Sequence, residues 1–343
     1  MAKKVDNFSP KLFSALLAVC ILSSGCSPVY VTKIAIGHAK FLWHRKDIDK
    51  ALKDPKTPPD LRSKLEIVQA ARAFAFERMS LRKSREYSTY SVVKGPYLTY
   101  LVEASEKLRF KPYLWHFPFA GTFPYKGHFN PDDANREATE LAAKGYDTYI
   151  GGVGAYNTPL WFSDPVPSTV LDYSAGDLAD LIIHELTHST IWYKNQIDFN
   201  ESMAEYVGGQ GAKEFLSARY GPQSEELAAF IKAQEDEVAF SREMDSLYAE
   251  LDSVYKSSAT DAAKLSSREA IFTEGLKRLN ALGFEYKTLN NAVILSHRVY
   301  HQDLSLFEKA YQTQGRDWAK TVAFLKTLDR RDPYADLKRR LGG

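Results

Sequence analysis

Residues 178–193, which read LADLIIHELTHSTIWY, constrain the fold more than any other stretch of the chain. They contain the pattern His-Glu-x-x-His as His184, Glu185 and His188. Residues four positions apart lie on one face of a helix, so the two imidazoles can reach the same metal ion. Apolar residues cover nearly the whole circumference of this helix, which predicts that it is buried. They are Leu178, Leu181, Ile182, Ile183, Leu186, Ile191 and Trp192.

A buried helix that carries two histidines and a glutamate must pair these groups, because an unpaired buried charge is very costly. A zinc ion would pair them, and catalytic zinc sites often take two histidines and one glutamate and leave a position for water. We expect Glu201 to be the third ligand, after a twelve-residue connection from Ser189 to Asn200. One turn further, Glu205 can accept the free N–H of a liganding histidine. The alternative is a buried network of histidine and glutamate without a metal.

Two resemblances extend this prediction. The segment Asn200–Glu205, which reads NESMAE and follows His184–His188, resembles the third-ligand helix of the gluzincin metallopeptidases, to which thermolysin belongs. The chain as a whole resembles a bacterial family described as putative zinc aminopeptidases of the cell envelope. The stretches that carry this second resemblance are residues 115–121, 125–129, 151–158, 290–292 and the two zinc segments. The resemblance implies an α+β, predominantly helical fold, in which a zincin-like core with a small sheet carries helical extensions at both ends.

The resemblance also implies an activity and a cofactor. The expected reaction is the hydrolysis of peptide bonds with one zinc ion held by His184, His188 and Glu201. Glu185 is expected to act as the general base that takes a proton from the activated water. Gluzincins stabilise the oxyanion with a tyrosine or a histidine, and Tyr300 is the first candidate here. The other candidates are His297, His301, Tyr193 and Tyr156.

Residues 147–156 predict a second part of the site. The alternation of Thr148, Tyr149 and Ile150 indicates a strand, and small residues follow it. Glycine in a strand often marks the close approach of another backbone. Zincins pair the substrate backbone with an edge strand upstream of the metal helix, and the resemblance implies that role here; a bulged structural strand is the alternative. The expected substrate-binding residues are Gly151, Gly152, Val153 and Tyr156.

The sequence leaves the kind of peptidase open. Gluzincin aminopeptidases hold the α-ammonium of the substrate with an acidic residue in their edge-strand motif, and residues 151–158 contain none. Asp147, Asp164 or Glu103 would have to serve instead. An aminopeptidase is the first hypothesis, an endopeptidase or oligopeptidase is the second, and a metal-dependent hydrolase of other substrates remains open.

A non-enzymatic function competes with these hypotheses. An envelope lipoprotein could keep zinc as a brace for the fold and bind partner proteins. A structural zinc site is usually closed by a fourth protein ligand, whereas a catalytic site leaves that position to water. Coordination by His116, His128 or Glu205 would therefore favour the non-catalytic alternative.

The first 25 residues predict export. Three lysines precede the apolar run Leu12–Leu22, which is too short for a membrane-spanning helix and typical of a secretory signal. The segment Ser23–Cys26 resembles the bacterial lipoprotein cleavage box, so Cys26 is expected to carry lipid and to become the N-terminus. Acyl chains anchor a protein to a bilayer surface without spanning it. Because Ser27 resembles the outer-membrane sorting pattern, we expect a lipid-anchored protein on the periplasmic face of the cell envelope, at the outer membrane; ordinary signal cleavage is the alternative.

Residues 26–343 are expected to form one metallopeptidase domain. Its three parts are a mainly helical part over 26–110, the sheet and zinc helices over 111–215, and a helical part over 216–343. Cys20 and Cys26 are the only cysteines, and export uses both, so no disulfide is expected. Lys and Arg total 45 and Asp and Glu total 43, a balance that gives no electrostatic case for nucleic acid. The expected partners are a peptide substrate and a membrane surface.

Overall fold

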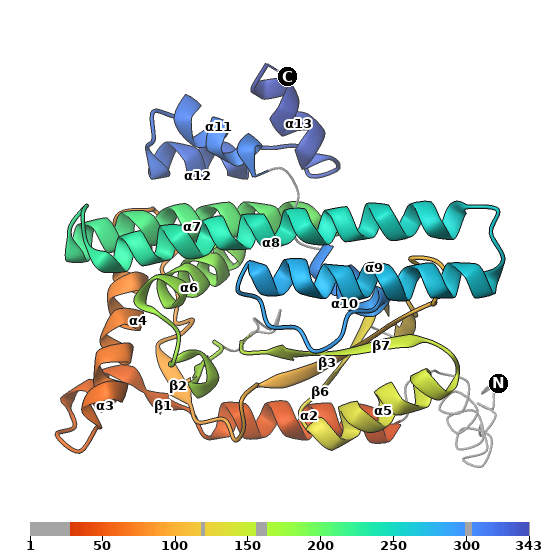
Figure 1. Cartoon of the computed structure of the whole chain (residues 1–343). Helices are drawn as coiled ribbons and strands as arrows, with labels where there is room; N and C mark the ends of the chain where they lie inside the picture. Colours follow the sequence, from red (N-terminus) through yellow and green to blue (C-terminus); the bar gives the residue numbers. More distant parts are fainter. Residues whose placement is uncertain (1–27, 118–120, 156–162, 299–303, 343) are drawn as a thin grey trace, which may run out of the picture.

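The computed structural model describes residues 28–117, 121–155, 163–298 and 304–342. In these ranges the protein is α+β and mostly helical, as the sequence predicts (Figure 1). The helices are α2 (Pro28–Trp43), α3 (Ile48–Lys53), α4 (Pro59–Glu77), α5 (Pro131–Ala143), α6 (Ala175–Thr190), α7 (Ile197–Tyr220), α8 (Glu225–Lys256), α9 (Asp261–Ala281), α10 (Asn291–Arg298), α11 (Ser305–Thr313), α12 (Trp318–Lys326) and α13 (Pro333–Arg340). The strands are β1 (Lys46–Asp47), β2 (Thr89–Ser91), β3 (Thr99–Ser105), β4 (Trp115–Phe117), β5 (Gly121–Phe123), β6 (Tyr125–His128), β7 (Asp147–Val153) and β8 (Val166–Pro167).

The strands β6, β3 and β7 form an antiparallel sheet in that order. Successive side chains of a strand point to opposite faces of the sheet. Val102 and Ala104 of β3 therefore share one face, where they pack in a cluster with apolar residues of α5. Glu103 points to the other face, in register with Tyr125 of β6 and Tyr149 of β7. Two smaller sheets, β1-β2-β8 and β4-β5, lie outside this one.

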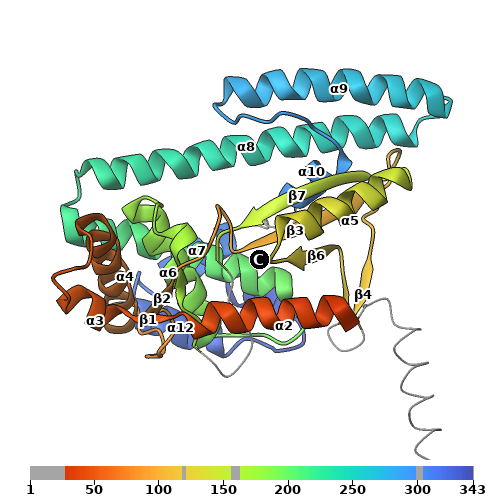
Figure 2. The same ribbon diagram turned by 90° about the horizontal axis from the view of Figure 1, so that it is seen from below.

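Long helices cover the sheet on the side opposite α5. The helices α8 and α9 run antiparallel to each other, and α10 lies between them and the sheet (Figures 1 and 2). Phe240, Leu247 and Phe272 belong to the apolar cluster that joins these three helices. None of the described helices is long and apolar enough to cross a membrane.

The helix α6, which carries the His-Glu-x-x-His pattern, lies in the largest apolar cluster of the protein. This cluster joins residues of α4, α6 and α7 and continues into α11, α12 and α13. Leu178, Ile182, Ile183 and Leu186 of α6 are fully buried in it. The prediction of a buried helix is thus confirmed, and the two histidines are attached to a rigid part of the core.

The end of α6 differs from the prediction. The helix stops at Thr190, and Ile191 has an extended backbone. Because α7 begins at Ile197, the connection is shorter than expected, and Glu201 lies within α7 itself. Trp192, which was predicted to be buried, is outside the helix and 56% exposed.

Asn200 gives the physical reason for this early turn. Its side-chain oxygen accepts a hydrogen bond from the Tyr193 backbone N–H at 2.9 Å, and its side-chain nitrogen donates to the Tyr193 carbonyl at 2.8 Å. Both residues are buried, so these bonds satisfy backbone groups that water cannot reach. The amide thus fastens the connection between α6 and α7 one residue before Glu201.

Candidate metal centre

The crossing of α6 and α7 depends on a glycine. A Cβ atom on Gly208 of α7 would lie 2.3 Å from Oδ1 of Asp180, 3.1 Å from the Asp180 carbonyl oxygen and 3.1 Å from Cβ of His184. Only a residue without a side chain permits this approach. Glu201 lies seven residues earlier on the same helix face, so the close crossing holds its carboxylate over the histidines of α6.

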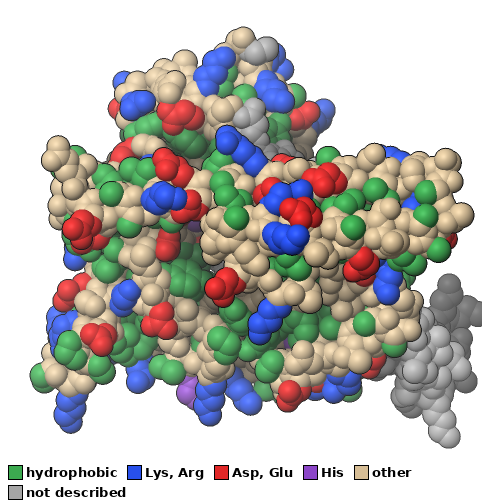
Figure 3. Space-filling model, viewed as in Figure 1, with side chains coloured by type: hydrophobic (Ala, Val, Ile, Leu, Met, Phe, Trp, Pro, Cys, Tyr) green, Lys and Arg blue, Asp and Glu red, His purple; other side chains and the backbone are tan. Residues whose placement is uncertain are grey.

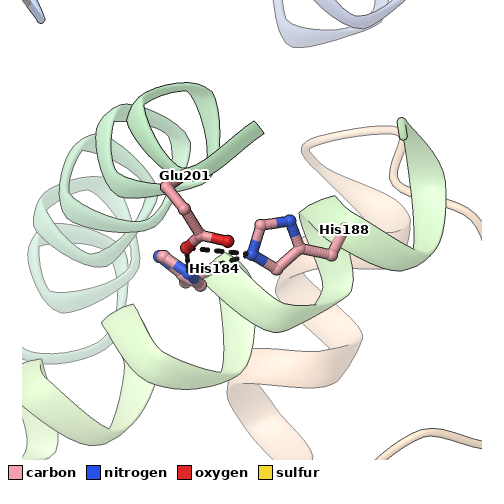
Figure 4. A group of neighbouring side chains, drawn as sticks. All are labelled: His184, His188 and Glu201. Carbon is pink, nitrogen blue, oxygen red and sulfur yellow. Dashed lines mark hydrogen bonds and ion pairs between the residues drawn. The ribbon is translucent and has the colours of Figure 1, made fainter. Parts of the chain in front are cut away.

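The side chains of His184, His188 and Glu201 point toward one another (Figure 4). The Nε2 atoms of the two histidines are 3.1 Å apart. Oε2 of Glu201 lies 3.5 Å from Nε2 of His184 and 3.5 Å from Nε2 of His188. Within the described ranges, this is the group of histidine and acidic side chains whose donor atoms converge closely enough to hold a metal ion.

The spacing of these donor atoms fits zinc. Zinc binds imidazole nitrogen and carboxylate oxygen at about 2.0–2.2 Å in a tetrahedral arrangement, which separates neighbouring ligand atoms by about 3.3–3.6 Å. Two nitrogens and one oxygen are also a donor set typical of zinc rather than of magnesium or calcium, which prefer oxygen alone. The three side chains are therefore a possible metal-binding group whose spacing is compatible with zinc.

Electrostatics around the three donors favour a cation. Burial opposes the ionised form of Glu201, but the two histidines outweigh it and lower the pKa of Glu201 to about 2. Burial disfavours protonated His184, yet the carboxylates of Glu201, Glu185 and Glu205 raise its pKa to about 9. Burial, and then the charge of Glu205, raises the pKa of Asp180 to about 8. The two imidazoles thus face an excess of carboxylates, which a divalent cation would balance.

Glu185 lies beside the histidines but outside the group of converging donor atoms. Its side chain is buried, and burial raises its pKa; the two histidines oppose this shift, and the carboxylates of Glu201 and Asp164 add to it. Among the described residues, Oε2 of Glu185 and the hydroxyl of Tyr87 are buried side-chain atoms that lack a hydrogen-bond partner. Glu185 is therefore a carboxyl group that is able to take up or release a proton next to the candidate metal position.

The other predicted ligands and supports lie further away. Glu205 faces the second nitrogen of the His184 ring, with Oε2 3.9 Å from Nδ1, which is longer than a hydrogen bond. His116 contacts the Thr122 hydroxyl at 2.7 Å, and His128 contacts Glu137 at 3.1 Å. In the described part of the chain, none of these residues completes the metal group.

Alternation along β6 decides which of its side chains face the centre. Lys126 and His128 point away and contact Glu137 of α5, at 2.7 Å and 3.1 Å. Tyr125 points to the opposite face. Burial, and then the charges of Glu201 and Glu103, raises the pKa of Tyr125, so its hydroxyl keeps its proton near the centre. The sequence interpretation did not select Tyr125. Its alternation with Lys126 predicts opposite faces for the two side chains, but only the strand register and the packing of α5 show which face lies toward Glu201.

The predicted oxyanion donors are not confirmed. Tyr300, His301 and Tyr156 lie outside the described residues. Tyr193 is buried and donates its hydroxyl hydrogen bond to the carbonyl of Leu325, a contact that turns it away from the metal group. His297 lies 2.8 Å from the Tyr286 hydroxyl, beneath α8.

The strand β7 occupies the edge of the sheet. Among the described strands it pairs only with β3, and the Thr148 carbonyl of β7 accepts a hydrogen bond from the Asn290 side chain at 2.9 Å. Gly151 shares the face of Glu103 and Tyr149, and Gly152 and Val153 continue the strand. A Cβ atom on Gly152 would lie 2.4 Å from the ring of Tyr97, so this glycine accommodates an aromatic ring rather than the neighbouring backbone that we expected.

Of the three proposed acids, Asp147 and Asp164 are buried, and Glu103 is only partly buried. Asp147 is buried in an ion pair with Arg268 at 2.6 Å and also accepts the backbone N–H of Asn291. Asp164 is fully buried, and its charge lies close enough to Glu185 to raise the pKa of that carboxyl. Glu103 lies on the sheet face shared with Tyr125, where burial raises its pKa to about 6 despite a hydrogen bond with Ser296 of α10.

A family described as "Putative aminopeptidase" matches residues 29–340 of the chain. The protein belongs to this family. The match runs from α2 to α13, so it includes the metal group, the sheet and the C-terminal helices, and it confirms the family resemblance that the sequence indicated. As a member of the putative aminopeptidase family, the protein has a His-His-Glu group that fits a metallopeptidase. Comparison with curated proteins and with solved structures gave no match.

Proposed function

We propose that the protein is a zinc-dependent peptidase with a zincin-like core, and that it acts as an aminopeptidase. The observation that carries the proposal is the convergence of the His184, His188 and Glu201 donor atoms within 3.1–3.5 Å of one another. The carboxyl of Glu185 beside them supplies the acid–base group that hydrolysis requires. Membership of the putative aminopeptidase family supports a peptide as the substrate.

The chain's own side chains have distinct tasks in this proposal. His184, His188 and Glu201 would hold the zinc ion, which, when bound, would supply a Lewis acid that polarises a carbonyl group and acidifies water. Glu185 takes a proton from the attacking water and returns it to the departing amine. Tyr125 donates a hydrogen bond to the oxyanion, because its protonated hydroxyl lies on the sheet face toward Glu201.

Selectivity for a free amino terminus is assigned to Glu103. Asp147 shares the sheet face of Tyr125 and Gly151 but is buried in its ion pair with Arg268, whereas the Glu103 carboxylate on the same face is only partly buried. A peptide that adds to the edge of β7 would bring its α-ammonium group to this face, where a half-buried carboxylate can pair with it. An endopeptidase would not need a carboxylate that binds the α-ammonium group of its substrate.

The proposed location is the periplasmic side of the bacterial cell envelope. The apolar run Leu12–Leu22 and the box that ends at Cys26 support export and lipidation, and Ser27 supports the outer membrane. These residues lie outside the described structure. Mass spectrometry of the mature N-terminus tests this part of the proposal, and an unmodified residue there would contradict it.

Replacement of Glu185 by glutamine tests the catalytic proposal. The variant keeps the shape of the side chain and leaves the three metal donors in place, so we expect it to retain zinc while peptide hydrolysis falls by about 10²–10⁴-fold. Metal content and hydrolysis of a peptide library are measured on the same preparation. Full hydrolysis by Glu185→Gln would contradict the general-base assignment. Absence of hydrolysis by the wild-type protein despite bound zinc would favour the non-catalytic, zinc-braced lipoprotein.

A further inference from the structure

The first described helix, α2, has an apolar stripe on its outer side. Val29, Ile36 and Trp43 follow one another at intervals of seven residues, which places them on one face of a helix. Their exposed fractions are 62%, 49% and 87%, respectively. Trp43 is the most exposed of the large hydrophobic residues in the described ranges. A surface of this kind marks an interaction site when it is continuous and bordered by polar residues.

The border of this stripe is basic. From Val29 to Lys46 the sequence contains no Asp or Glu, whereas Lys33, Lys40, Arg45 and Lys46 are all exposed. Lys33 contacts Asp133 of α5 at 2.7 Å. The lower surface of the molecule, where α2 lies, carries projecting Lys and Arg side chains (Figure 3). The stripe therefore combines apolar contact area with positive charge.

The inner side of α2 is firmly attached to the sheet. The hydroxyl of Tyr30 donates to the carbonyl of Gly127 in β6 at 3.0 Å, and the hydroxyl of Ser91 in β2 donates to the carbonyl of Phe41 at 2.8 Å. The ring of Phe129 lies against Gly37, where a Cβ atom would be only 2.3 Å away. A surface that holds the outer side of α2 would therefore fix the orientation of β6, the strand that carries Tyr125.

We propose that α2 is an interfacial helix that lies on an anionic lipid bilayer. Amphipathic helices with basic borders bind in the plane of the headgroups, and tryptophan prefers that interface. The position in the chain supports a bilayer rather than a protein partner, because α2 begins two residues after Cys26, the expected site of the lipid anchor. The acyl chains would hold the start of α2 at the membrane, and its apolar stripe and lysines would lay the helix flat.

The experiment reproduces the anchor chemically. The mature protein from Cys26 onward has a single cysteine, which is coupled to a maleimide lipid in vesicles. The vesicles contain brominated phospholipid, which quenches the fluorescence of tryptophans that enter the bilayer. Wild-type protein is compared with Trp43→Phe and Ile36→Asn, and Leu265→Asn is the matched control because Leu265 is an exposed apolar residue of α9. Circular dichroism confirms that each variant is folded.

We expect phosphatidylglycerol-rich vesicles to quench the wild-type protein and the Leu265→Asn control equally. Quenching should fall by about twofold or more in Trp43→Phe and in Ile36→Asn, and by a similar factor in vesicles of phosphatidylcholine alone. Equal quenching of the wild type and Trp43→Phe would overturn the proposal, as would quenching that does not depend on lipid charge. A soluble dimer that Ile36→Asn dissociates would also overturn it, because a second copy of the chain would then cover the stripe.

Discussion

At the scale of single residues, alternation along two strands decides which side chains share the sheet face toward Glu201. In β6, Lys126 and His128 contact Glu137 on one face of the sheet. Tyr125 points to the opposite face, toward Glu201. In β3, Glu103 points to the same face as Tyr125. Lys126 and His128, the candidate site residues in the sequence of β6, therefore have a structural role, and the tyrosine that precedes them is the better functional candidate.

Replacement of Glu103 by glutamine tests its proposed task. We expect Glu103→Gln to lower kcat/KM for peptides with a free amino terminus by about 10–100-fold, because a charged hydrogen bond to the α-ammonium is lost. Hydrolysis of the matching N-acetylated peptides should be unchanged. Equal loss on both kinds of peptide would contradict the assignment.

The raised pKa of Glu103 predicts a pH dependence of the same reaction. Because its pKa is about 6 in the folded protein, the carboxylate that binds an ammonium group is lost as the pH falls through 6. Wild-type kcat/KM for free peptides should fall there, and that component should be missing in Glu103→Gln. The ionised form also costs the folded state stability above pH 6, so the variant should be as stable as the wild type or up to about 2 kcal/mol more stable at neutral pH.

At the scale of elements, the centre depends on how closely α6 and α7 cross. The predicted helix α6 is found, and its N-terminus is capped by Ser174, whose hydroxyl accepts the backbone N–H of Asp177 at 3.1 Å. The sequence does not reveal where α6 ends, because its apolar pattern continues through Ile191 and Trp192. Long-range contacts decide this boundary, above all the bonds from Asn200 to Tyr193.

Two adjacent glycines of α7 provide a matched pair of variants. A methyl group at Gly208 would meet the Asp180 backbone and the His184 side chain, whereas one at Gly209 would meet only the end of the Gln234 side chain, at 2.6 Å. We expect Gly208→Ala to lower the free energy of unfolding by about 1–3 kcal/mol and to weaken zinc binding. Gly209→Ala should be neutral or stabilising by up to about 1 kcal/mol, because alanine favours the helix. Chemical denaturation measures the free energy of unfolding of both variants. Equal effects of the two substitutions would show that the crossing does not depend on Gly208.

At the scale of the whole molecule, the sequence predicts the α+β class, the buried metal helix and the convergence of His184, His188 and Glu201. These features follow from the apolar periodicity of the helix and from the short stretch of chain between His188 and Glu201. The positions of Glu103, Tyr125 and Glu137 could not be predicted, because strand register and the packing of α5 join segments far apart in the chain. The division of residues 26–343 into one domain with three parts remains a prediction.

Glu137 connects three elements across the sheet, and its ionisation predicts the acid sensitivity of the fold. It accepts hydrogen bonds from Trp115 of β4 and Lys126 of β6 and contacts His128; burial opposes its charge, but these partners lower its pKa from 4.5 to about 2. A lowered pKa adds stability that is fully present above pH 4.5 and is lost as the pH falls toward 2.

We expect Glu137→Gln to lower the free energy of unfolding at pH 7 by about 1–3 kcal/mol, and the difference from wild type should shrink below pH 4. Glu140→Gln, an exposed change on the same helix, serves as the control. Denaturant titrations over this pH range measure the effect. A destabilisation that is constant down to pH 2 would contradict the role of the Glu137 charge.

The metal content of the purified mature protein tests the central claim most directly. Elemental analysis should find about one zinc ion per chain in the wild type and far less in His188→Ala and Glu201→Ala. Removal of the metal by a chelator should abolish peptide hydrolysis, and added zinc should restore it. A folded wild-type protein without zinc, or a zinc content unchanged in both variants, would contradict the account.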